Sequence, residues 1–236
     1  LVQTGKISAS LIDSAVGRIL KNKFDLGLFE KPFVNESLID GSLDKTEYKR
    51  AGLNAQKRSV VLLKNSDMYE AVLPISSSSN IYIEGFSAEV GSQFGKIVSD
   101  PKKADFIIIN IPSVFNGNQD PGSNKLIDKL LSTVITDVNL NLNPDTIAKV
   151  IEYSKVATLI VVVDLNRPAI LSSIDNFVDG LVGTFGVSDA VIFKMIFGDF
   201  NPTGKLPFEI PKSMDQVVLQ KEDLPDDTCL LYTSDA

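Results

Sequence analysis

The chain has 236 residues, with 23 lysines and arginines against 30 aspartates and glutamates, which gives a formal charge of −7. Apolar residues make up 44% and charged residues 22%, a balance that is typical of a folded globular protein and excludes a disordered chain. The acidic balance argues against a nucleic-acid partner, and no apolar run approaches the ~20 residues of a membrane-spanning helix.

The first predicted element is an amphipathic helix that begins near Ser10 and ends before Gly27. Its apolar residues recur at helical spacing and form one stripe: Leu11, Ile12, Ala15, Val16, Ile19 and Leu20. Ser10 is the expected N-cap, Gly27 the expected C′ residue, and Pro32 prevents continuation. A stripe this strong needs a partner surface. Residues 30–44 lose the periodicity and are predicted to form a surface linker, after which residues 47–57 regain helical character.

From residue 60 onward, short β-branched runs alternate with amphipathic segments. The runs predict strands at residues 60–63, 81–83, 106–111, 159–163 and 178–182, and the segments predict helices at 124–131, 144–154 and 189–197. This alternation indicates an α/β fold with a mostly parallel sheet sandwiched by helices. Ligands of such sheets bind outside the carboxyl ends of the strands. The polar loop at residues 116–123, directly after a predicted buried strand, is therefore the first place to look for a site.

Several catalytic and binding motifs fail in this sequence. It contains no histidine, which excludes Ser-His-Asp and Cys-His catalysis within the chain and any His-ligated zinc site. The segment from Gly198 to Leu206 has five residues between its glycines where a phosphate-binding P-loop has four. Leu206 also stands where that motif needs Ser or Thr. The better interpretation is a structural turn at residues 202–204, after which residues 205–207 lead into an edge strand. The sequence also has no GxGxxG turn between a strand and a helix, which argues against nucleotide binding.

Several segments in a common order resemble glycoside hydrolase family 3. The most specific is residues 197–208, Phe-Gly-Asp-Phe-Asn-Pro-Thr-Gly-Lys-Leu-Pro-Phe, which is similar to that family's Gly-x-x-Asn-Pro-x-Gly-Lys-Leu-Pro signature. The other segments resemble the end of the catalytic barrel at residues 5–8, 18–20 and 23–29, the opening of the second domain at 59–65 and 73–75, and a later loop at 164–168.

The resemblance implies a domain organisation and an activity. Residues 1–33 correspond to the terminal helix of a truncated barrel, 34–52 to a linker and 53–225 to the α/β sandwich domain, while 226–236 look like a non-native or disordered tail. Family members hydrolyse terminal β-linked sugars with retention and without cofactor or metal, as β-glucosidases or related exo-enzymes. The expected partners are a β-glycoside or oligosaccharide substrate and the missing barrel. The family's nucleophile, an Asp on a late barrel strand, would lie upstream of Leu1, so the isolated fragment is predicted to be inactive. Localisation stays open.

The family's acid/base departs from its usual form here. In many members it is a Glu on the loop after a strand that resembles residues 104–109, but residues 111–123 contain no Glu, and Asp120 is their only carboxylate. Asp120 is a candidate acid/base, the alternative being a solvated loop residue. Phe115, Asn116 and Asn118 are candidate substrate-binding residues, although Phe115 could instead close the core.

Three further interpretations stay open. Arg167 could pair with a carboxylate at a domain interface, or Pro168 could start a helix. Glu84 and Asp164, at other strand ends, are expected to be capping or interface residues. For the whole chain, the missing loop Glu favours the alternative of a non-catalytic α/β binding or scaffold module.

Overall fold

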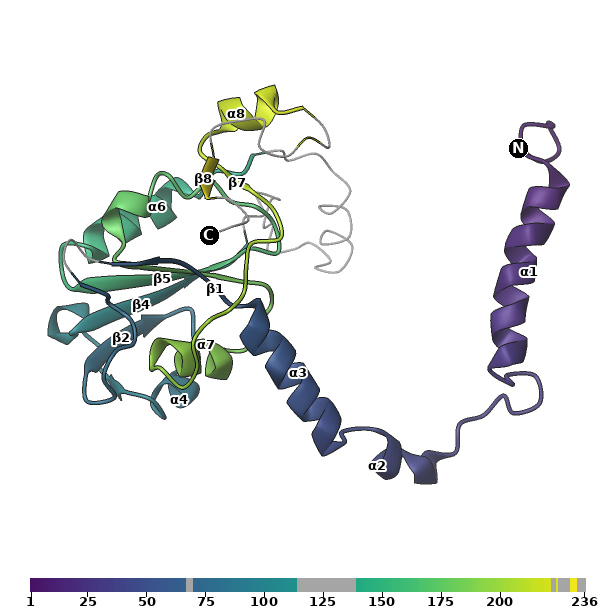
Figure 1. Ribbon diagram of the computed structural model, residues 1–236, viewed down its shortest axis with the longest axis horizontal. Helices are drawn as coiled ribbons and strands as arrows, with labels where there is room; N and C mark the ends of the chain where they lie inside the picture. Colours follow the sequence, from purple (N-terminus) through teal and green to yellow (C-terminus); the bar gives the residue numbers. More distant parts are fainter. Residues whose placement is uncertain (67–69, 114–138, 222–223, 225–229, 233–236) are drawn as a thin grey trace, which may run out of the picture. The chain divides into compact units, whose positions relative to one another are not determined.

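The computed structural model describes residues 1–66, 70–113, 139–221, 224 and 230–232 (Figure 1). By its internal contacts the chain divides into two compact units, Leu1–Arg50 and Ala51–Ala236. Each unit is described by itself below. No helix in the described part of the chain is long and apolar enough to cross a membrane.

The first unit is built around α1, Ala9–Asp25. Its N-cap is Ser8, whose hydroxyl accepts from the Leu11 amide at 3.3 Å. The prediction of Ser10 was wrong, because Ser8 is the last residue with extended backbone and Ser10 already lies inside the helix. Gly27 is confirmed as C′: its φ is +66°, and the amides of Gly27 and Leu28 bond the carbonyls of Phe24 and Lys23.

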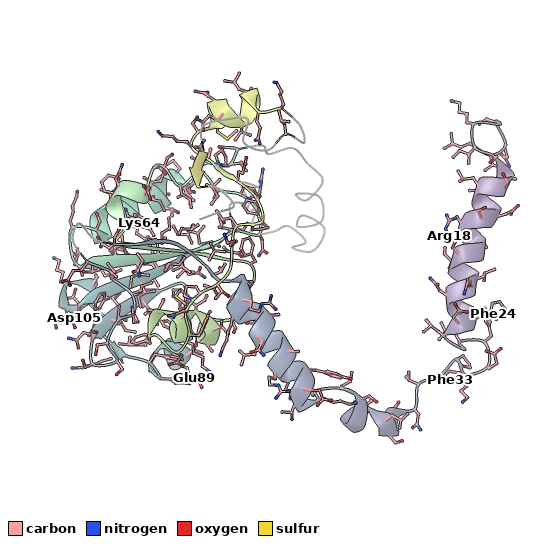
Figure 2. All side chains as sticks on the ribbon, viewed as in Figure 1. Arg18, Phe24, Phe33, Lys64, Glu89 and Asp105 are labelled. Carbon is pink, nitrogen blue, oxygen red and sulfur yellow. The ribbon has the colours of Figure 1, made fainter. Side chains whose placement is uncertain are left out.

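The apolar stripe of α1 is exposed. None of its residues is buried, and the aromatic side chains of this unit are also open to solvent, with Phe24 60% and Phe33 89% exposed (Figure 2). The predicted linker contains two short elements, a 3-10 helix η1 at Glu36–Leu38 and α2 at Ile39–Ser42. Helix α3, Thr46–Ser59, then leads into the second unit.

The second unit contains a six-stranded sheet in the order β1-β6-β5-β4-β2-β3. The strands are β1 Val61–Asn65, β2 Asn80–Glu84, β3 Lys96–Ile97, β4 Phe106–Ile111, β5 Thr158–Asp164 and β6 Gly180–Thr184. Only β1 runs antiparallel to its neighbour among these strands, so the predicted mostly parallel sheet is confirmed. Strand β3 was not predicted, because two residues carry no periodicity.

Helices cover both faces of the sheet (Figure 1). Helix α6, Pro144–Tyr153, covers one face, and α4, Ala88–Gly91, with α7, Asp189–Ile196, covers the other. Alternate residues of β5 feed the two cores: Leu159, Val161 and Val163 on the α6 side, Ile160 and Val162 on the α7 side. Burial on both faces explains why this strand is a continuous apolar run.

Beyond the sheet, residues 205–207 lead into a short strand as expected. This strand is β7, Ile210–Pro211, which pairs antiparallel with β8, Leu230–Tyr232, and is followed by α8, Met214–Leu219. No helix starts at Pro168. Its segment instead forms an isolated parallel bridge between Ile170 and Asn141, in which the Ile170 amide donates to the Leu140 carbonyl at 2.8 Å. The remaining short elements are η2, Pro101–Lys103, and η3, Asp175–Phe177. The predicted helix at residues 124–131 lies outside the described residues.

Candidate functional site

The candidate site is the edge of the sheet at which the parallel strands end. Strands β2, β4, β5 and β6 run in one direction, so their carboxyl ends meet at this edge, where α/β sheets bind ligands. The polar side chains near those ends are Glu84 on β2, Asn110 on β4, Asp164 on β5 and Thr184 on β6. Each belongs to a run of apolar strand residues whose burial fixes its position.

The site residues predicted from the sequence follow β4 along the chain. Phe115, Asn116, Asn118 and Asp120 all lie outside the described residues, so their assignments stay predictions. Strand β4 itself is fixed, since Ile107, Ile108, Ile109 and Ile111 are buried on the two faces of the sheet.

Glu84 is tied to helix α6. Its two oxygens are shared between two side chains of that helix: Lys149 Nζ lies 2.5 Å from Oε1, and the Tyr153 hydroxyl donates to Oε2 at 2.8 Å. Tyr153 also lies edge-on to Tyr82, with ring centroids 5.7 Å apart and hydroxyl oxygens 3.4 Å apart. Lys149 and Tyr153 are four residues apart, so they share a face of the helix. The result is a polar cluster that joins β2 to α6.

The same contacts shift the pKa values of the three ionisable side chains in this cluster. Burial raises the pKa of Glu84, but the hydrogen bonds from Lys149 and Tyr153 outweigh it and leave the pKa below its ordinary value of 4.5. The hydrogen bond to Glu84 raises the pKa of Lys149 above 10.5. Burial, followed by the bonds to Tyr82 and Glu84, raises the pKa of Tyr153. Glu84 is therefore a carboxylate at neutral pH, whereas a general acid needs a raised pKa.

The other strand ends are also tied, but to their own loops. Both Asp164 oxygens accept from Asn166, one from its amide N–H and one from its side chain, each at 3.0 Å. The Asn110 side chain donates to the Gly85 carbonyl at 3.4 Å. Gly85 has φ +78°, and a Cβ there would lie 2.9 Å from the Asn110 carbonyl oxygen. These contacts shape the edge and agree with the capping role expected of Asp164.

Glu84 and Asp164 do not form a catalytic pair of carboxylates. Glu84 aligns with Ile109, and Ile109 with Val161, so Asp164 stands three residues further along and two strands away. Strand spacing and rise place their backbones ~14 Å apart. Glu84 lies on the α6 face and Asp164, in phase with Ile160 and Val162, on the α7 face. Glycosidase carboxylates are about 5–5.5 Å apart in retaining enzymes and ~6.5–9.5 Å apart in inverting ones.

Sequence reasoning missed two members of the Glu84 cluster. Lys149 and Tyr153 carry no motif, and only the four-residue spacing of two polar side chains on one face of α6 could have drawn attention to them. Nothing in the described residues groups three or more His, Cys, Asp or Glu side chains in a way that could hold a metal ion. The interface role of Arg167 stays a prediction.

The chain is similar to known proteins both in sequence and in fold. The glycosyl hydrolase family 3 C-terminal domain matches residues 60–235. The chain is 34% identical to a periplasmic beta-glucosidase/beta-xylosidase of Dickeya chrysanthemi over 228 residues, which cover 96% of this chain and 34% of that protein. It is 33% identical to beta-glucosidase C of Emericella nidulans, covering 97% of this chain and 36% of that protein.

Among solved structures, the fold matches a beta-glucosidase from Listeria innocua in complex with isofagomine, with a TM-score of 0.67 at 18% identity, over 100% of this chain and 39% of that one. The same enzyme has also been solved in complex with glucose. The chain thus spans about a third of the length of the relatives it matches, at 34% and 36%.

Proposed function

The chain belongs to glycoside hydrolase family 3, and from this premise we propose that it forms part of a retaining enzyme that cleaves terminal β-linked sugars from glycosides or oligosaccharides. One observation carries the proposal. The similarity to the Dickeya and Emericella enzymes covers 96% and 97% of the chain, so it takes in nearly all of the first unit as well as the α/β unit. A free-standing α/β module would give no reason for the first fifty residues to be similar too.

The substrate class follows from the named relatives. Both curated relatives are beta-glucosidases by name, one also a beta-xylosidase, and the Listeria enzyme binds glucose and isofagomine. We therefore propose a β-glucoside or β-xyloside substrate. Retaining hydrolysis itself requires only two carboxylates, one as nucleophile and one as acid/base, and no cofactor.

The two catalytic carboxylates are proposed to lie outside the described strand ends. Glu84 is ion-paired with a lowered pKa, and Asp164 is hydrogen-bonded to Asn166 on the opposite face of the sheet. Asp120 remains the candidate acid/base, with Phe115, Asn116 and Asn118 as sugar contacts, because these residues follow β4 in the sequence and β4 ends at the edge where such sheets bind ligands. The nucleophile is proposed to come from the barrel, beyond these 236 residues.

The same reasoning gives a proposed domain organisation. Residues 1–33 are the terminal barrel helix, 34–52 the linker and 53–225 the α/β sandwich domain. The division of internal contacts between Arg50 and Ala51, next to the proposed linker end, supports it. The exposed stripe of α1 supports a barrel partner for the first unit. Of the proposed non-native tail at 226–236, only Leu230–Tyr232 are described, and they pair with β7.

The proposal predicts that the 236-residue chain alone does not hydrolyse β-glycosides. The measurement is release of 4-nitrophenol from 4-nitrophenyl β-glucoside and β-xyloside, compared with buffer and with the Asp120→Asn variant. We expect the chain, its variant and buffer to give the same rate. Turnover that the wild-type chain shows and D120N loses would mean that both carboxylates lie within these residues.

The absence of Glu from residues 111–123 favours one alternative, a non-catalytic α/β binding or scaffold module. Calorimetric titration of the isolated chain with glucose, xylose and cellobiose separates the two functions. A binding module holds a sugar on its own and gives saturable heat. One part of a two-domain active site lacks the barrel's share of the sugar contacts and gives none.

A further inference from the structure

Helix α3 is held by the α/β unit at one end. Of its residues from Ala51 onward, only Gln56, Lys57 and Ser59 are partly covered, and the preceding ones are exposed. The helix runs directly into β1, and the segment that follows α7 passes the junction (Figure 1). Whatever fixes the direction of α3 on the sheet must therefore act on its last turn.

The first contact on this turn comes from the start of α7. The side-chain oxygen of Gln56 accepts two hydrogen bonds from Ser188, one from its backbone N–H at 3.0 Å and one from its hydroxyl at 2.9 Å. Ser188 stands at the N-cap position of α7, where a serine hydroxyl ordinarily accepts from the helix's own amides. Here it makes no such bond. Its hydroxyl instead donates to the side chain of Gln56 on α3.

The other two contacts come from the family signature segment. Lys57 Nζ lies over the ring of Phe200, 5.2 Å from its centroid. The Gly204 amide donates to the Val60 carbonyl at 3.1 Å. A Cβ on Gly204 would lie 2.5 Å from the Val60 oxygen and 2.9 Å from the Arg58 oxygen, both backbone atoms. Gly204 does not have a positive φ, so this closeness, and not backbone conformation, requires glycine.

We propose that Gln56, Lys57, Ser188, Phe200 and Gly204 form a clasp whose role is to fix the direction in which α3 leaves the α/β unit. The signature at residues 198–207 then has the structural role of holding the end of α3, and it is not a ligand-binding loop. Because a helix is stiff, holding its last turn restricts the motion of the α3 residues from Ala51 onward relative to β1. This role is independent of the proposed catalytic function, since it needs neither substrate nor barrel.

The test is hydrogen exchange of the 236-residue chain, followed by mass spectrometry of peptides from α3 and from β5. In Gly204→Ala the added methyl group cannot fit against two backbone carbonyls. We expect exchange at the α3–β1 junction to accelerate by roughly tenfold, the factor that corresponds to the loss of one or two hydrogen bonds. Exchange in β5 should not change. Gly52→Ala is the matched control, because Gly52 lies on the same helix with open space around it.

A second variant, Gln56→Met, keeps the side-chain length, removes the acceptor for Ser188 and introduces no backbone clash. We expect acceleration confined to the last turn of α3, and this variant decides the matter if G204A does not fold. Wild-type exchange in α3 for Q56M, or equal acceleration in α3 and β5, would overturn the clasp and assign these residues to general core packing.

Discussion

At the residue scale, the polar groups of the sheet edge are arranged to satisfy one another. Glu84 has one donor for each of its oxygens, and so does Asp164, but the donors differ in kind. The donors of Asp164 come from its own loop, whereas those of Glu84 come from a helix distant in sequence, with Lys149 65 positions further along the chain. Glu84 therefore connects two elements, and its removal should be felt in the stability of the unit.

Glu84→Gln tests this connection through its pH dependence. Because the folded pKa of Glu84 lies below 4.5, its contribution to stability is present above about pH 4.5 and is lost as the pH falls through the folded pKa. We expect E84Q to lower the free energy of unfolding by up to about 1 kcal/mol at neutral pH, since the pair is partly exposed and screened by solvent. Urea unfolding at neutral and acidic pH measures the difference.

The control for E84Q is Glu152→Gln, because Glu152 is an exposed residue of α6, the helix to which Glu84 is bonded. Its substitution should leave the unfolding free energy within about 0.5 kcal/mol of the wild-type value. A loss in E84Q that stays constant down to about pH 3 would show that the carboxylate's charge is not what joins β2 to α6.

At the scale of elements, α7 carries the greatest share of aromatic packing in the described core. Phe193 is fully buried and lies within 5.1 Å of Phe86, 5.8 Å of Phe94 and 6.5 Å of Phe197, measured between ring centroids. We expect Phe193→Ala to lower the free energy of unfolding by about 3–5 kcal/mol, because the cavity is walled by side chains that cannot all collapse into it.

Thermal or urea unfolding measures this loss, and Phe177→Ala is the comparison. Phe177 lies in η3 and is 39% exposed, so less apolar area leaves water when the chain folds. Removing its ring should lower the free energy of unfolding by clearly less than removing the ring of Phe193. Equal losses in the two variants would mean that the ring cluster on α7 does not stabilise the sheet more than an ordinary surface contact.

The elements that the sequence predicted well are those whose burial is two-sided or strongly periodic. Strands β4 and β5 were located because residues buried on both faces leave an apolar run, and α6 and α7 because their apolar residues follow the helical period. The bond from Gly204 to Val60 could not be predicted, because it joins residues 144 positions apart and no local pattern contains it. The Glu84 cluster was missed for the same reason.

At the scale of the whole molecule, the two units differ in how they use their apolar residues. The α/β unit buries most residues of β4, β5 and β6, while α1 exposes its stripe, with Leu11 56% and Ile19 58% open to solvent. An apolar face of this extent marks an interaction surface. The same face is available to a second copy of the chain.

Isolated chains are therefore expected to associate through α1, and Ile12→Glu with Ile19→Glu should keep them monomeric. The two isoleucines lie two turns apart on the stripe. An apolar partner would therefore have to bury the added charges, which is unfavourable. Ser10→Glu with Ser14→Glu adds the same charge to the opposite face and should associate like the wild type. Sedimentation velocity over a concentration series distinguishes the variants. If both pairs of substitutions dissociate the chain alike, the change in net charge and not the loss of the stripe explains the dissociation. If the wild type is monomeric throughout, the stripe needs a larger complementary surface than α1 itself provides.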